Sequence, residues 1–148
     1  MRIEIDQSWK LEDTSKPTVI AFSSRNKSES IYISSKDKKR LQDHYRKCGK
    51  HKIYAYKTFA ILIYLLIKDY LSEIDGIEVD TEYLGKENLI KDFLLEFIWR
   101  TNPRFDKNLI TFRRVTKGSD SHKEAISVFR KKHQPTKTVA LREIKKRV

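Results

Sequence analysis

The chain has 148 residues, with 32 Lys or Arg against 20 Asp or Glu, so its formal net charge at pH 7 is +12. The single cysteine, Cys48, excludes an internal disulfide and a cysteine-based zinc site, and it fits a reducing, intracellular setting. The basic excess predicts a polyanionic partner, attracted by long-range electrostatics and counterion release. The alternative is a lysine-rich surface of the thermophilic kind with no nucleic-acid role.

The length suits one domain with a real hydrophobic core. Residues 1–6 carry charges where a signal peptide needs an apolar core. The longest unbroken apolar run, residues 59–67, is too short for a bilayer, which needs about 20 residues. We therefore expect a soluble, cytoplasmic protein that does not enter a membrane.

Three short strands are predicted before residue 35. Residues 2–6 alternate with period two, with Ile3 and Ile5 on the apolar face, and residues 18–23 and 30–34 form the second and third strands. The connections between them are short, so an antiparallel meander is the simplest pairing.

A strongly basic helix is predicted next, capped by Ser34 or Ser35 and continuing to about Lys47. Its basic side chains form either a solvated helix face or a surface that contacts phosphates. With the segment that follows and two later positions, the predicted nucleic-acid-binding residues are Lys36, Lys38, Lys39, Arg40, Lys50, Lys52, Lys57, Arg113 and Lys117.

The central stretch of the chain, residues 56–83, predicts a buried helix that leads into a strand. Residues 59–67 are apolar on nearly every helical face, and residues 77–80 alternate after Gly76. A helix that leads into a strand is half of a β-α-β crossover, which favours a parallel sheet. The strand ends at Asp80, and ligands gather at that end of strands in open α/β sheets.

Three further elements follow. An amphipathic helix runs from Gly85 to the Asn102-Pro103 pair, and residues 109–115 form a fifth strand. A last helix begins at Ser119 or Ser121. We therefore expect one domain over residues 1–133 and a basic tail over 134–148, whose apolar residues allow a short docked helix.

The element order and three acidic positions together resemble the ribonuclease H-like superfamily, which includes RuvC-type junction resolvases, transposases and integrases. The resemblance covers residues 1–132 and depends on Asp6 ending the first strand, Asp80 ending the fourth and Asp120 opening the last helix. It implies an α/β fold with a mixed five-stranded sheet flanked by helices. The first three strands would be antiparallel, and the fourth and fifth would run parallel to the first.

The resemblance also implies a site that holds two Mg²⁺ or Mn²⁺ ions beside the scissile phosphate. Its metal ligands would be Asp6, Asp80 and Asp120, and His122 would complete the catalytic set. Hard divalent cations prefer oxygen ligands, and a pair of them can activate water and stabilise a leaving oxygen. The alternatives are that Asp6 and Asp80 are ordinary turn residues and that Asp120 only complements the helix dipole.

One position of the superfamily pattern is missing, because the helix before the fourth strand has no carboxylate near its N-terminus. Asp69 and Glu73 lie at its C-terminal end, so we expect them to be remote from Asp6 and Asp80. Asp43, in the preceding segment, is the available substitute.

These observations favour a metal-dependent nuclease that hydrolyses nucleic-acid phosphodiesters, on DNA or RNA. The alternative is a non-catalytic nucleic-acid-binding module of the same fold. The absence of a carboxylate near the start of the central helix favours this alternative. A scaffold or toxin-like protein that docks an acidic protein is a third class. A homodimer is compatible with a junction-resolving activity.

Overall fold

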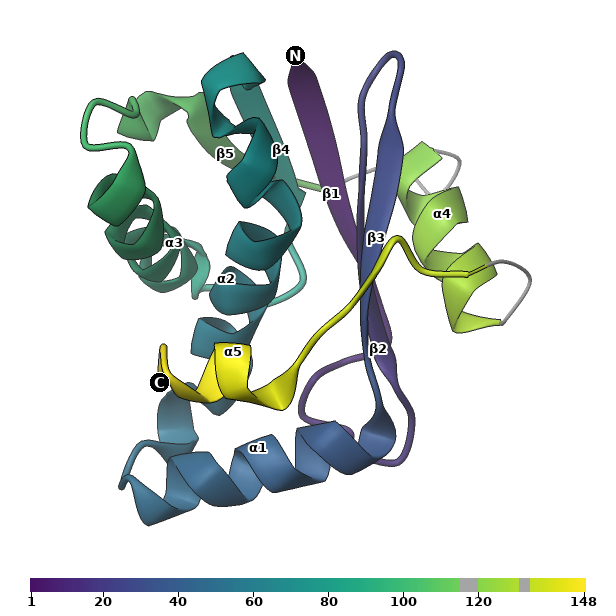
Figure 1. Ribbon diagram of the computed structural model, residues 1–148, viewed down its shortest axis with the longest axis vertical. Helices are drawn as coiled ribbons and strands as arrows, with labels where there is room; N and C mark the ends of the chain where they lie inside the picture. The colour runs from purple at the N-terminus through teal and green to yellow at the C-terminus, as the bar shows by residue number, and fades with distance from the viewer. Residues whose placement is uncertain (115–119, 131–133) are drawn as a thin grey trace.

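The computed structural model describes residues 1–114, 120–130 and 134–148 and has an α/β fold built on a six-stranded mixed sheet (Figure 1). The strand order is β5-β4-β1-β2-β3-β6. The strands are β1 Arg2–Ser8, β2 Thr18–Ser23, β3 Ser28–Ile33, β4 Gly76–Asp80, β5 Ile110–Arg113 and β6 Lys137–Thr138.

The strand pairings follow the expected pattern. Strands β1, β2 and β3 form an antiparallel meander, β4 lies parallel to β1, and β5 lies parallel to β4. The expectation of five strands was wrong by one, because β6 pairs in parallel with the outer edge of β3. This strand has only two residues, too few for any alternation to be recognised in the sequence.

Five α-helices and three 3₁₀ turns lie in the described parts of the chain. The helices are α1 Ser35–Lys47, α2 Tyr54–Ile67, α3 Glu87–Thr101, α4 Asp120–Phe129 and α5 Leu141–Lys145, and the 3₁₀ turns are η1 His51–Ile53, η2 Lys68–Glu73 and η3 Lys107–Leu109. None of these helices combines the length and apolar content needed to span a bilayer.

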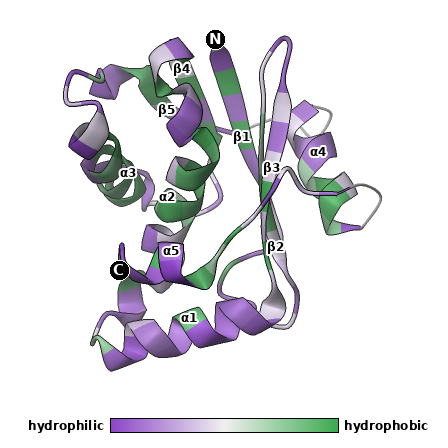
Figure 2. Cartoon of the chain, viewed as in Figure 1, coloured by the Kyte–Doolittle hydropathy of each residue, from purple (hydrophilic) through white to green (hydrophobic). Residues whose placement is uncertain are grey.

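The main core lies between the sheet and α2, with α3 packed on the outer side of α2 (Figure 1). Ile3 and Ile5 of β1 and Ile77 and Val79 of β4 are fully buried on this face. The prediction of a buried central helix is confirmed, since every α2 residue except Tyr56 and Lys57 is buried, and Figure 2 shows its apolar character.

Helix α4 covers the opposite face of the sheet over β1, β2 and β3 (Figure 1). A small second core joins Val19 and Ala21 of β2 to Ala125 and Val128 of α4. Side chains alternate along a strand, so Asp6, whose Cα partner is Ala21, points to this face and away from the main core. We call it the α4 face.

The C-terminal segment crosses the sheet edge and packs against α1 and α2. Ile144 of α5 is fully buried in the main core. The Lys137 ammonium donates to the backbone oxygen of Leu65 at 3.0 Å, near the last turn of α2. The last carbonyls of an α-helix have no intrahelical donor, and Lys137 supplies a donor in this last turn.

Candidate active site

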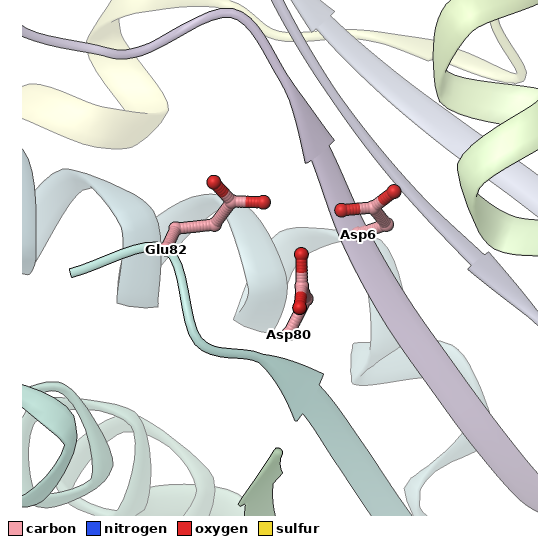
Figure 3. A group of neighbouring side chains, drawn as sticks. All are labelled: Asp6, Asp80 and Glu82. Carbon is pink, nitrogen blue, oxygen red and sulfur yellow. The ribbon is translucent and has the colours of Figure 1, made fainter. Parts of the chain in front are cut away.

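Three carboxylates converge on the α4 face where β4 ends beside β1, two residues before the end of β1. Ile5 and Val79 are direct partners across the parallel strands, so the following residues, Asp6 and Asp80, lie side by side. Glu82 follows β4 by two residues, and its side chain points back toward the other two (Figure 3). One oxygen from each of the three carboxylates lies within 4.8 Å of the others.

This cluster is shielded from water, and the shielding changes its protonation. Asp6 is 2% exposed, and Asp80 and Glu82 are partly buried. Burial, followed by the neighbouring Asp80 carboxylate, raises the pKa of Glu82 to about 9. Burial and Asp80 also raise the pKa of Asp6. Without a cation, the cluster therefore holds a proton at neutral pH to reduce the repulsion between carboxylates.

A histidine from the first turns of α4 completes the group. His122 Nδ1 lies 2.7 Å from Asp6 Oδ2, and the contact opposes the rise in the pKa of Asp6. The other Asp6 oxygen accepts from the backbone N–H of Gln7 at 2.8 Å. Both Asp6 oxygens are therefore held in place, and the imidazole ring is oriented toward the cluster.

A second network joins the segment after β1 to the segment after β4. The Tyr83 hydroxyl accepts from Gln7 Nε2 at 3.1 Å and from the Leu11 backbone N–H at 3.4 Å. The Tyr54 hydroxyl of α2 donates to the Leu11 carbonyl at 2.8 Å. Tyr83 is adjacent to Glu82, so these bonds fix the backbone that presents the third carboxylate.

The predicted acidic residues separate into two groups. The structure brings Asp6 and Asp80 together and places His122 against Asp6. Asp120 is exposed at the start of α4 and is not a member of the carboxylate group, so its metal role stays a prediction. Asp43 is exposed on α1, 3.5 Å from Arg46, and also lies outside the group.

The two carboxylates at the C-terminal end of the buried helix lie far from the site, as expected. The Asp69 carboxylate lies 3.4 Å from the Lys137 ammonium at the β3 edge of the sheet. The Glu73 carbonyl accepts from the N-terminal amine of Met1, which precedes β1. Both residues belong to η2, which leads into the start of β4, whereas the site lies where β4 ends.

Glu82 is a site residue that the sequence pattern did not single out. Its signal was the Asp-Thr-Glu spacing at residues 80–82, immediately after the fourth strand. In an extended backbone, residues i and i+2 point to the same side, so a second acid two positions after Asp80 could have been assigned to the same cluster. It supplies the third carboxylate that the central helix lacks.

The predicted basic surface is present in part. Lys36, Lys39 and Arg40 are exposed on α1, and Lys52 is exposed in η1. Lys50 and Lys57 each donate to the Val148 carbonyl, at 3.0 and 2.8 Å, and Arg113 donates to the buried Glu78 carboxylate at 2.7 Å. Lys117 lies outside the described residues.

Lys38 corrects one prediction, because it is buried and faces the protein. Its ammonium donates to the backbone carbonyls of Lys10, Asp13 and Lys16 at 2.6–3.0 Å and contacts the Thr18 hydroxyl at 2.9 Å. With 0% exposure, the side chain cannot reach a phosphate. Lys38 instead organises the segment between β1 and β2, and the sequence gives no sign of this because its neighbours on α1 are equally basic.

Comparison with protein-family models finds no match to this chain, and comparisons with curated proteins and with solved structures also find none. The function is therefore inferred from the geometry and chemistry of the site.

Proposed function

We propose that the chain is a divalent-metal-dependent nuclease that hydrolyses nucleic-acid phosphodiesters, with a site of the ribonuclease H-like kind. The observation that carries this proposal is the convergence of Asp6, Asp80 and Glu82 where β4 ends beside the parallel strand β1. The order of the first five strands and their pairing directions agree with the arrangement that the resemblance implies.

The residues present fit Mg²⁺ or Mn²⁺. Asp6, Asp80 and Glu82 offer carboxylate oxygens, which are the ligands that hard cations prefer, and this group contains no cysteine that would favour a softer metal. Burial, followed by the neighbouring Asp80 carboxylate, raises the pKa of both Asp6 and Glu82, and a bound cation would favour their charged forms. Such ions supply Lewis-acid activation of water and stabilisation of the leaving oxygen in phosphodiester hydrolysis.

The protein's own side chains have separate roles in this proposal. Asp6, Asp80 and Glu82 hold the metal, and Asp6 is kept in place by the Gln7 N–H and by His122. His122 lies at the edge of the cluster and is 28% exposed, so it can exchange a proton with a reacting group or with solvent.

The exposed basic residues of α1 are the candidates for the phosphate backbone. The Lys38 ammonium ties α1 to the segment that directly follows β1, so α1 lies at the same end of the sheet as the carboxylates. Lys36, Lys39 and Arg40 are exposed on this helix. Contacts of this kind position a nucleic acid without reading its sequence.

The metal site is tested by calorimetric titration with Mn²⁺ of the wild type and of Asp6→Asn, Asp80→Asn and Glu82→Gln. We expect binding in the wild type, and its loss or strong weakening in each variant. Asp43→Asn, which alters an exposed carboxylate outside the cluster, is the matched control and keeps wild-type binding. Equal binding by the wild type and all three site variants would contradict the assignment of the metal ligands.

The reaction is tested with end-labelled single strands, duplexes and branched duplexes incubated with Mg²⁺ or Mn²⁺. We expect metal-dependent cleavage that EDTA abolishes and that the three site variants lack, while their binding to nucleic acid is kept. Salt-sensitive binding without cleavage of any substrate would instead favour the non-catalytic binding module.

A further inference from the structure

The first residue beyond β1, Trp9, has a backbone conformation that bulky residues rarely adopt. Its φ is +71°, and among the described residues it is the one non-glycine residue with positive φ. This left-handed region brings Cβ close to the backbone and is costly for a residue as large as Trp. Such strain persists only where the surrounding structure enforces it, and it concentrates at functional sites.

Hydrogen bonds at Trp9 and at the two residues after it enforce the conformation. The Trp9 carbonyl accepts from the Thr18 hydroxyl at 3.1 Å, and the next carbonyl, of Lys10, accepts from the Lys38 ammonium at 3.0 Å. The Leu11 side chain is fully buried, and its backbone is bonded to Tyr54 and Tyr83. The segment therefore holds the Trp9 backbone in one place just beyond the end of β1.

The ring is held at the surface rather than in the core. Trp9 is 40% exposed, and one of its faces lies against Phe129 of α4, with ring centroids 5.5 Å apart and planes within 10°. Phe129 follows His122 by seven residues, about two helical turns, so both lie on the same side of α4. One helix thus supports both the aromatic pair and the histidine of the site.

The aromatic pair also lies close to the carboxylates. Trp9 follows Asp6 by three residues, a span of about 10 Å at the rise of an extended strand. This span corresponds to about three stacked nucleotides at a rise of 3.4 Å each. A strand whose phosphate lies at the carboxylates therefore brings one of its neighbouring bases to Trp9.

We propose that Trp9, supported by Phe129, is a stacking platform for an unpaired base close to the scissile phosphate. The substrate is then a single strand, or a duplex with unpaired nucleotides at the cleavage position. Stacking on an aromatic side chain needs a free base face, which an intact duplex does not offer. The net charge of +12 provides the complementary attraction to the strand. This inference rests on the proposed nuclease function.

The first test uses Trp9 as its own reporter. The chain has two Trp residues, and Trp99 donates its indole N–H to the Phe105 carbonyl beyond the end of α3, so Trp99→Phe leaves Trp9 as the single tryptophan. This variant is titrated in EDTA with a single-stranded oligonucleotide and with a blunt duplex of the same length. We expect the single strand to quench the fluorescence and the duplex to leave it nearly unchanged. Equal quenching by both would overturn the proposal.

The second test compares Trp9→Phe with Trp9→Leu. Stacking on aromatic residues accounts for about 5- to 150-fold in affinity per base. We therefore expect Trp9→Leu to weaken single-strand binding at least 5-fold, measured by anisotropy of a labelled oligonucleotide, and Trp9→Phe to change it less than 3-fold. Unchanged binding by Trp9→Leu would overturn the stacking role.

Calorimetry with Mn²⁺ separates the two proposals. If Trp9→Leu binds Mn²⁺ as the wild type does, its site is folded and any loss of single-strand affinity reports on stacking. If the wild type cleaves duplexes but binds single strands no better than Trp9→Leu does, the stacking proposal is overturned and the proposed nuclease function is retained. A wild type that binds neither Mn²⁺ nor any nucleic acid would overturn both.

Discussion

His122 Nδ1 lies 2.7 Å from Asp6 Oδ2, and this contact joins residues 116 positions apart in the sequence. Asp6 is nearly fully buried, whereas His122 is partly exposed, so the pair connects the interior of the carboxylate cluster to solvent. The contact also places α4 over β1. The helix that closes one face of the sheet therefore contributes directly to the site.

Replacing His122 with Ala should lower the cleavage rate by about 10²–10⁴-fold, the range typical of a lost acid–base group. Nucleic-acid affinity should be unchanged, because the exposed basic residues remain. Single-turnover cleavage at saturating enzyme measures the first quantity, and anisotropy measures the second.

His44→Ala is the matched control, since His44 lies on α1 beside Cys48 and not at the cluster. It should cleave at the wild-type rate. An equal loss of rate in both variants would argue against a specific role for His122.

The metal-free protein should lose stability as the pH rises from 5 to 8. The pKa of Glu82 is raised to about 9 in the fold, against an ordinary value of 4.5, so the folded state binds the proton more tightly over this window. Unfolding then releases a proton, and the free energy of unfolding falls as the pH rises. A loss of roughly 2 kcal/mol or more is expected, because one pKa unit corresponds to about 1.4 kcal/mol.

Urea unfolding in EDTA at several pH values measures this effect. Glu82→Gln carries no titrating group at this position and should show a flatter dependence than the wild type. Burial lowers the pKa of Lys38 to about 8, so its titration adds a second change near the upper end of this range. Lys38 is present in both proteins, so the comparison with Glu82→Gln isolates the effect of Glu82. Identical slopes for the two proteins would contradict the raised pKa of Glu82.

Lys38→Met should destabilise the fold by about 3–5 kcal/mol. The substitution removes the buried donor that three partly buried backbone carbonyls share, and it leaves them without that partner. Urea unfolding at pH 7 measures the change.

Lys39→Met provides the comparison, because it alters the adjacent exposed lysine of the same helix. It should change stability by less than about 0.5 kcal/mol. Similar values for the two variants would show that the buried ammonium has no special structural role.

Neutralising Lys36, Lys39 and Arg40 together as Gln should weaken nucleic-acid binding and reduce its salt dependence. The slope of log affinity against log salt should fall by about 0.7–0.9 for each phosphate that the variant no longer neutralises. The equivalent triple change at Arg25, Arg104 and Lys107, which are exposed near the opposite end of the sheet, should leave the slope nearly unchanged. Equal slopes for the two triple variants would place the binding surface elsewhere.

The sequence predicted the first five strands, the central buried helix and the proximity of Asp6 and Asp80. Period-two alternation reports on the face a strand buries, and parallel neighbouring strands must end at the same edge. The sequence did not reveal β6, because a strand of two residues that pairs with the edge of a distant strand carries no local pattern. It also misassigned Lys38, since burial of a lysine depends on carbonyls from a loop about 20 to 30 residues away in the chain.

The Lys38 contacts couple the local unfolding of two neighbouring segments, α1 and the chain between β1 and β2. The segment between β1 and β2 has few apolar side chains and would ordinarily exchange its amide hydrogens through independent local fluctuations. Its carbonyls are instead bound to an ammonium that belongs to α1, so this segment cannot detach without stripping a buried charge of its partners. The segment and the helix should therefore unfold as one cooperative unit, with similar hydrogen-exchange protection, although one is a loop and the other a helix.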